Sequence, residues 1–172
     1  MKRWGPMDVA LVAVTLAGAY LLKRHYSTAN ADALAWILRP TAWLVERAVG
    51  TSFHHEAGAG WIMADRSFTI ARPCAGVNFM IVAWCTATLA FVRARRGLAQ
   101  KVALVAGGLV AAYAVALATN TLRIVLALWL RDADLGPRDT VHHLEGVIVY
   151  VTCLCVCYAA ARRALVPADA VR

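Results

Sequence analysis

The sequence predicts an all-α integral membrane protein, a polytopic helical bundle of about five transmembrane helices. Composition is the first reason: 61% of the 172 residues are hydrophobic and the mean hydropathy is +0.60, which leaves too few charges to cover a soluble globule. The second reason is that several apolar runs are about as long as a helix needs to cross a bilayer core. We expect one integral membrane domain over residues 1–172, with spans at Met7–Leu22, Ala33–Val49, Gly76–Val92, Val102 to about Leu130, and His143 to about Ala161.

The first run, Met7–Leu22, lies between Lys2-Arg3 and Ala29-Asn30-Ala31, and this arrangement imitates a cleavable signal peptide. However, Lys23-Arg24-His25 follow the run directly, where a cleavable signal has small neutral residues. We therefore expect this segment to be retained as a membrane anchor.

Two other runs depart from a simple span. Ala33–Val49 contains Arg39-Pro40 and the charged pair Glu46-Arg47, so it is either a kinked span or an interfacial helix whose charges reach the headgroups. The run from Val102 to Leu130 is too long for a perpendicular span. It must tilt, kink near Thr119-Asn120, or extend beyond the lipid.

The segment Gly58–Arg72 differs from the long apolar runs, because it has two short apolar runs on either side of Asp65-Arg66. This pattern fits a small β-hairpin whose second strand would deliver Pro73-Cys74 to the membrane edge. An irregular loop fits the same residues equally well.

Basic residues predict the orientation, because short cytoplasmic loops are enriched in Lys and Arg. The loop with Arg93, Arg95, Arg96 and Lys101 and the end at Arg162-Arg163 should face the cytoplasm. With five spans in the inner membrane, the N-terminus should then lie outside and Lys23-Arg24 inside, although Lys2 and Arg3 argue against that placement. Cys74, residues 131–141 and His142 should all lie on the extracytoplasmic side.

The net charge of +8 fits this topology and contact with anionic membrane lipids. Basic residues interleaved with aromatic ones, which would suggest nucleic-acid binding, are not found, and we expect no nucleic acid as a partner.

Cys74 differs from the other four cysteines, which fall inside predicted spans without metal-site spacing: Cys85, Cys153, Cys155 and Cys157. We expect these four to be packing residues, and we expect the protein to have no metal site and no cofactor.

Cys74 lies just before Gly76, which is expected to open a helix whose positive end would favour a thiolate at Cys74. Asn78, four residues on, should project to the same side and donate a hydrogen bond to it. Taken alone, Cys74 also fits a structural cysteine in a tight turn.

Arg123 is the second unusual residue, because a guanidinium in an apolar run costs at least a few kcal/mol on insertion scales. Asn120, one turn earlier, shares its helix face.

His142 opens the last run. Glu145 is placed to orient the His142 imidazole, and Gly146, four residues after His142, allows another backbone or a substrate to approach closely. Each has a structural alternative: an anchoring or helix-packing role for Arg123, and an interfacial polar role for His142.

Three motifs in this order, each at a span boundary, resemble the signature of the exosortase/archaeosortase family: Pro73-Cys74-Ala75-Gly76, Asn120-x-x-Arg123 and His142-x-x-x-Gly146. The resemblance covers about Phe68 to Tyr150. The chain is short for the family and has fewer spans than most members, and Ala75 stands where many members carry serine. Its brevity and residues 71–79 are similar to the small K-type exosortases.

The resemblance implies a polytopic membrane enzyme, a cysteine transpeptidase or peptidase that processes C-terminal sorting signals through an acyl-enzyme. Cys74 would be the nucleophile, His142 the general acid and base, and Arg123 the oxyanion ligand, supported by Asn120. The implied partners are membrane-anchored proteins that end in a short motif, a transmembrane helix and a basic tail. Neither the choice between an amine and a glycolipid acceptor nor that between hydrolysis and transpeptidation follows from the sequence.

Three alternatives stay open at this point. A lipid phosphatase or phosphotransferase would use Arg123 and His142 for phosphate, but it would leave Cys74 idle. A haem or quinone site would need a second histidine within a span, and His25, His54 and His55 all lie in predicted loops. A non-catalytic membrane assembly protein fits the composition but leaves the buried arginine unexplained.

Overall fold

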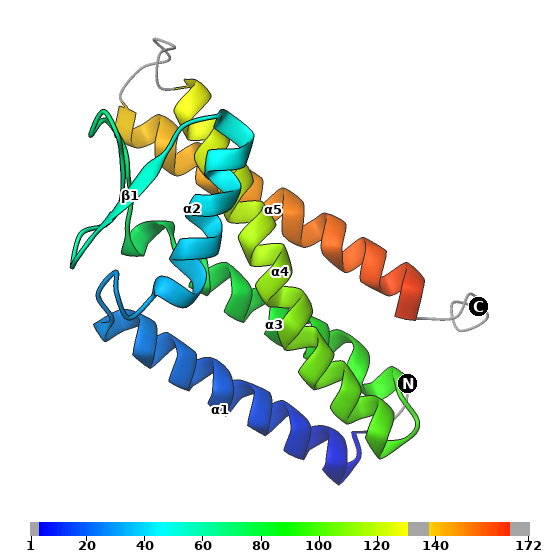
Figure 1. Cartoon of the computed structure of the whole chain (residues 1–172). Helices are drawn as coiled ribbons and strands as arrows, with labels where there is room; N and C mark the ends of the chain where they lie inside the picture. The colour runs from blue at the N-terminus through cyan, green and yellow to red at the C-terminus, as the bar shows by residue number, and fades with distance from the viewer. Residues whose placement is uncertain (1–3, 131–137, 166–172) are drawn as a thin grey trace.

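The computed structural model describes residues 4–130 and 138–165, which form a helical bundle with a small sheet at one end (Figure 1). Four helical segments of this part are long and apolar enough to cross a membrane, which confirms the polytopic all-α bundle: Pro6–Thr28, Arg72–Ala94, Leu98–Leu130 and Gly146–Leu165. The elements are α1 (Pro6–Thr28), α2 (Ala35–Val49), β1 (Phe53–Glu56), β2 (Gly60–Met63), β3 (Thr69–Ile70), η1 (Arg72–Cys74), α3 (Val77–Phe91), η2 (Val92–Ala94), α4 (Leu98–Leu130) and α5 (Arg138–Leu165).

The second predicted span forms α2, which has 15 residues. Such a helix is about 22 Å long, shorter than the roughly 30 Å of a bilayer core, and α2 is not among the four segments that could cross. It packs against α4 and contacts β1 and β2 instead. The structure therefore has four segments able to span the membrane where the sequence suggested about five.

The β-hairpin predicted around Asp65-Arg66 is present as the antiparallel pair β2 and β3, with Trp61 opposite Ile70 and Ile62 opposite Thr69. The sheet has a third strand that the sequence did not predict, because β1 pairs antiparallel with the other side of β2. The turn is sharp: Arg66 has a positive φ of 57°. The chain leaves β3 directly into η1, which carries Cys74.

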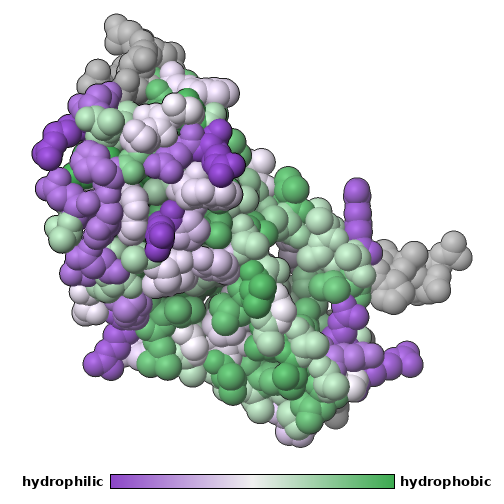
Figure 2. Space-filling model, in the orientation of Figure 1, coloured by the Kyte–Doolittle hydropathy of each residue, from purple (hydrophilic) through white to green (hydrophobic). Residues whose placement is uncertain are grey.

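One end of the bundle carries Arg93, Arg95 and Arg96 around the turn between α3 and α4, together with Arg162 and Arg163 of α5. We call the end with the turn between α3 and α4 the basic end, and the opposite end, which carries the sheet and Cys74, the sheet end. Figure 2 shows hydrophilic residues gathered at both ends and hydrophobic residues over the helices between them. Large side chains exposed there, as expected for a lipid-facing surface, include Val14, Tyr20, Val110, Ile148 and Val156.

The N-terminal end of α1 lies at the basic end, as does the C-terminal end of α5 (Figure 1). Asp8 of α1 forms an ion pair with Lys101 of α4, and the Arg93 guanidinium lies 5.0 Å from the Trp4 ring. The sequence analysis expected the N-terminus on the side opposite the basic loop, and Lys23-Arg24 on the same side as that loop. The structure contradicts this arrangement, because the start of α1 contacts the basic loop. The reason is that α2, with 15 residues, is too short to be a further span, so one crossing fewer separates α1 from the turn between α3 and α4.

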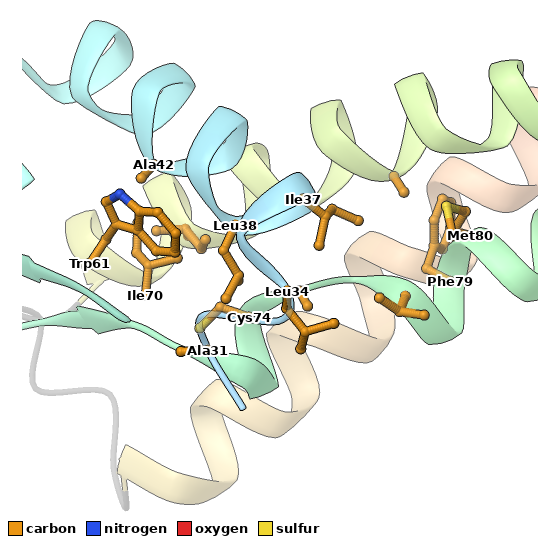
Figure 3. Packing of buried hydrophobic residues seen from close by; sticks show 14 of the residues in the cluster. Ala31, Leu34, Ile37, Leu38, Ala42, Trp61, Ile70, Cys74, Phe79 and Met80 are labelled. Carbon is orange, nitrogen blue, oxygen red and sulfur yellow. The ribbon is translucent and has the colours of Figure 1, made fainter. Parts of the chain in front are cut away.

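The buried core joins α2, the sheet, α3 and α4 near the sheet end (Figure 3). Leu34, Ile37 and Leu38 from the start of α2 are fully buried, and so are Ile70 of β3 and Ala75. This packing fixes the position at which the chain passes from the sheet into α3.

Candidate functional site

The Cys74 turn is built by Pro73 and Gly76. Pro73 lies in the 3-10 turn η1, where the Cys74 N–H donates to the Ala71 carbonyl over 2.8 Å and the Ala75 N–H donates to the Arg72 carbonyl over 3.0 Å. Gly76 then reverses the chain direction with a left-handed φ of 66° and caps α3. The turn places Cys74 immediately before the N-terminus of a membrane-spanning helix.

Gly76 also packs tightly against α4. A Cβ at this position would lie 3.4 Å from both Cβ and Cγ of Asn120 and 3.7 Å from the Ala116 carbonyl oxygen. Glycine therefore serves two purposes here, because it adopts the left-handed conformation and it allows α4 to come close.

Asn120 holds the Cys74 turn from α4. Its side chain is fully buried, and its amide Nδ2 donates a hydrogen bond to the backbone carbonyl of Cys74. The amide Oδ1 accepts a 3.1 Å hydrogen bond from the Tyr150 hydroxyl of α5. Three helices thus meet at one buried amide.

Arg123 is buried at the same level, with 8% of its surface exposed. Its Nε atom is buried and has no hydrogen-bond partner among the residues that the structure describes. Its guanidinium carbon lies 5.7 Å from the centre of the Tyr150 ring. A desolvated guanidinium with unused donor capacity is suited to binding a negative charge.

Gly146 of α5 faces Arg123. A Cβ on Gly146 would lie 3.5 Å from Cδ and 3.7 Å from Nη1 of Arg123, so the two helices approach each other at this point. His142 precedes Gly146 by four residues within α5, a spacing that puts the two positions on one helix face. The side chains of His142, His143 and Glu145 lie outside the described part of the structure.

Asn78 has a different partner from the one predicted. Its Oδ1 accepts a 2.8 Å hydrogen bond from Lys23 of α1. The prediction that Asn78 donates to Cys74 assumed a continuous helix from residue 74 to residue 78. Gly76 interrupts that helix with its left-handed backbone, so a four-residue step no longer returns to the same face.

Tyr150 is the residue that the sequence analysis missed. It contacts both Asn120 and Arg123, and its ring also stacks on Phe79 of α3 with centroids 5.2 Å apart. A signal was present, because Tyr150 follows Gly146 by four residues and therefore shares its helix face. However, tyrosine is common at the membrane–water interface, so its presence in a spanning helix does not by itself indicate contacts with Asn120 and Arg123.

A cover of apolar side chains lies over Cys74, which is only 8% exposed (Figure 3). The cover comes from the segment before α2 and from α2 itself, through Ala31, Leu34 and Leu38. Trp61 and Ile70 of the sheet belong to the same buried cluster. The thiol therefore lies in a water-poor environment between the bundle and the sheet.

The other four cysteines lie away from this turn, in the spanning parts of α3 and α5, as free thiols. Cys85 and Cys153 are partly buried against the core, whereas Cys155 is exposed. Within the described residues, no group of three or more His, Cys, Asp or Glu side chains is placed to hold a metal ion.

Comparison with known proteins gives one family. The model of the transmembrane exosortases matches residues 4–159, from the start of α1 to the last third of α5. The match does not distinguish the K-type from other subtypes. Searches of the curated proteins and of the solved structures give no match. The matched region contains the whole Cys74, Asn120, Arg123 and Gly146 arrangement, and the chain belongs to the transmembrane exosortase family.

Proposed function

We propose that this protein is a membrane cysteine transpeptidase or peptidase that removes the C-terminal sorting signal of secreted proteins. One arrangement carries the proposal, in which Arg123 lies between the positions of His142 and Cys74. The buried Nε of Arg123 has no hydrogen-bond partner among the described residues, and Arg123 packs against Gly146, one turn from His142. Asn120, one turn before Arg123 in α4, donates a hydrogen bond to the Cys74 carbonyl. Membership of the exosortase family supports the same chemistry. A phosphate-handling role would not require Asn120 to hold a cysteine.

In the proposed reaction, the Cys74 thiolate attacks a backbone carbonyl of the substrate, and the carbonyl oxygen gains the negative charge. Arg123 donates hydrogen bonds to that oxygen. His142 in its protonated form gives a proton to the leaving amine as the C–N bond breaks, which leaves the acyl group on Cys74. Neutral His142 then takes a proton from the acceptor, an amine or water, which attacks the acyl carbon and releases Cys74.

The site would face the extracytoplasmic side of the inner membrane. With four spans, the positive-inside rule agrees with this placement, because the basic end carries Arg93, Arg95 and Arg96 between α3 and α4 and Arg162-Arg163 at the end of α5. Lys2 and Arg3, which contradicted a five-span topology, agree with a four-span one. Six basic residues lie at the sheet end, between the last turns of α1 and the start of α3: Lys23, Arg24, Arg39, Arg47, Arg66 and Arg72. That segment also carries Asp32, Glu46, Glu56 and Asp65.

A cavity of about 680 Å³ between α3, α4 and α5 would accept one face of the transmembrane helix of the substrate. Its walls carry small side chains that allow close helix approach, including Ala83, Ala87, Ala103, Gly107 and Ala111. The cavity also reaches Leu154, one turn beyond Tyr150, so a helix in it would end just below the site. The scissile bond would then leave the hydrocarbon near Cys74.

The test is processing in cells. A secreted protein from the same genome that ends in a short motif, one transmembrane helix and a basic tail is co-expressed with each variant, and its mass is measured. Wild type should release the shortened product and Cys74→Ala should leave the substrate intact. Cys85→Ala, which removes a thiol from the same spanning segment, is the matched control and should process normally. Normal processing by Cys74→Ala would overturn the proposal.

A further inference from the structure

Tyr150 contacts both halves of the candidate site. Its hydroxyl bonds to Asn120, which holds the Cys74 turn, and its ring lies beside the guanidinium of Arg123. A single side chain of α5 therefore touches the group that fixes the nucleophile and the group suited to stabilise the oxyanion.

The Cys74 carbonyl, which can only accept, determines which way the Asn120 amide points, and the Tyr150 hydroxyl holds the other end of that amide in place. An amide has one accepting and one donating end, and the neighbouring groups decide its orientation. The Tyr150 hydroxyl donates to Oδ1, which leaves Nδ2 to donate to the Cys74 carbonyl. In the reversed orientation, Oδ1 would face the carbonyl oxygen of Cys74 and the two acceptors would repel each other. Asn120 is fully buried, so water does not correct a wrong orientation.

The ring holds Arg123 by a separate contact. It stacks on Phe79 with an interplanar angle of 24°, and the Arg123 guanidinium lies beside the same ring. An aromatic ring favours a cation near its face, and the effect is larger away from water. Phe79 thereby fixes the ring, and the ring limits where the guanidinium can lie.

We propose that Tyr150 is a positioning residue for the reaction, which acts through its hydroxyl on the Cys74 turn and through its ring on Arg123. The inference rests on the proposed function, because the positions of Cys74 and Arg123 matter only if they act together. It adds that the geometry of the site depends on a residue that lies outside the three sequence motifs.

The hydroxyl is tested with Tyr150→Phe, which keeps the ring. Tyr158→Phe is the matched control, because Tyr158 lies two turns further along α5 and stacks on Phe91 at 5.8 Å in the same way. We expect Tyr150→Phe to lower the kcat of substrate processing about tenfold with KM unchanged, and Tyr158→Phe to change neither.

A second readout needs no substrate. In a protein whose Cys74 is the only cysteine, the rate of alkylation by N-ethylmaleimide measures how well the buried thiol is held. Tyr150→Phe removes the hydrogen bond that holds the Asn120 side chain against the Cys74 turn, so it should speed alkylation at least about threefold while processing falls. Asn120→Ala should do the same, and the double variant should alkylate no faster than Asn120→Ala alone, since the hydroxyl reaches the Cys74 turn through Asn120.

The outcomes separate the two ideas. Faster alkylation in Tyr150→Phe with no processing by any variant would retain the positioning role and overturn the proposed function. Unchanged alkylation and kcat, or additive effects of Tyr150→Phe and Asn120→Ala, would overturn the positioning role. The positioning role would also be overturned if Tyr150→Phe failed to accumulate in the membrane while Tyr158→Phe accumulated normally. Tyr150 would then only support the fold.

Discussion

The Tyr113 hydroxyl of α4 donates a 2.8 Å hydrogen bond to the backbone carbonyl of Trp36 in α2. Trp36 lies four residues before Pro40, which has no N–H to give to that carbonyl. The bond therefore replaces the one that the proline removes, and the two aromatic rings stack with centroids 5.8 Å apart. This contact fixes the short helix α2, and with it the cover over Cys74, to the spanning helix α4.

Tyr113→Phe should destabilise the protein by about 1 kcal/mol, because the Trp36 carbonyl loses its donor. In a Pro40→Ala background the same change should cost almost nothing, since the substituted alanine supplies a backbone N–H to that carbonyl. Thermal unfolding of the four proteins in detergent measures the coupling. An equal loss of stability in both backgrounds would show that the hydroxyl does not act as the substitute donor for this carbonyl.

Arg123→Lys keeps the positive charge and loses the planar fork of donors. If Arg123 stabilises an oxyanion, the variant should insert and accumulate normally but lose at least about 10²-fold in cleavage, as expected for a lost oxyanion donor. Quantifying the product at equal protein levels checks this. Cleavage within a few fold of wild type would make Arg123 an anchor, and loss of the protein would make it a structural residue.

Gly146 should tolerate alanine and reject leucine. A Cβ there makes ordinary contacts at 3.5 and 3.7 Å with Arg123, whereas a leucine side chain would need the space that Arg123 occupies. We expect Gly146→Ala to process within a few fold of wild type and Gly146→Leu to lose at least about 10²-fold, with the displacement of Arg123 as the cause. Val147→Leu, on the neighbouring exposed position, is the control and should have no effect. Equal activity of the two Gly146 variants would place Arg123 outside the reaction.

The two adjacent histidines should differ. His142 shares a helix face with Gly146, and His143 is turned by about 100°. His142→Ala should abolish product formation while His143→Ala retains most of it, measured with the same substrate. The opposite result would move the general acid and base to the neighbouring face of α5.

The four-span topology is tested with single cysteines. In a protein from which the native cysteines have been removed, His54→Cys in β1 and Arg96→Cys in the turn before α4 place exposed thiols at opposite ends of the bundle. On intact cells, a membrane-impermeant maleimide should label position 54 at once and position 96 only after permeabilisation. The reverse pattern would put the candidate site in the cytoplasm.

Much of the fold could be predicted because hydrophobic runs long enough to cross a bilayer have few alternatives to a helix. The run at α2 was less certain because its charges fit both a span and an interfacial helix, and only its packing on α4 and the sheet decides the outcome. Strand β1 was missed because His54, His55 and Glu56 are polar and exposed, so the segment lacks the alternation typical of a strand.

The site was predicted unevenly for a similar reason. Residue type and position in a run singled out Cys74, Asn120 and Arg123, since each is an unusual choice in an apolar segment, and the structure brings the three to one end of the bundle. The partner of Asn78 depends on the backbone of Gly76, and the role of Tyr150 depends on how α5 packs against α4. Both are tertiary facts, which the spacing of residues along one helix does not contain.

The cover of α2 and the sheet over Cys74 has a consequence for the second half of the reaction. A thioester on Cys74 would lie beneath Leu34 and Leu38, where bulk water has little access. Its lifetime in the proposed reaction would then depend less on hydrolysis than on the arrival of the acceptor. The short helix would in this way keep the acyl group of the proposed intermediate from being lost to solvent.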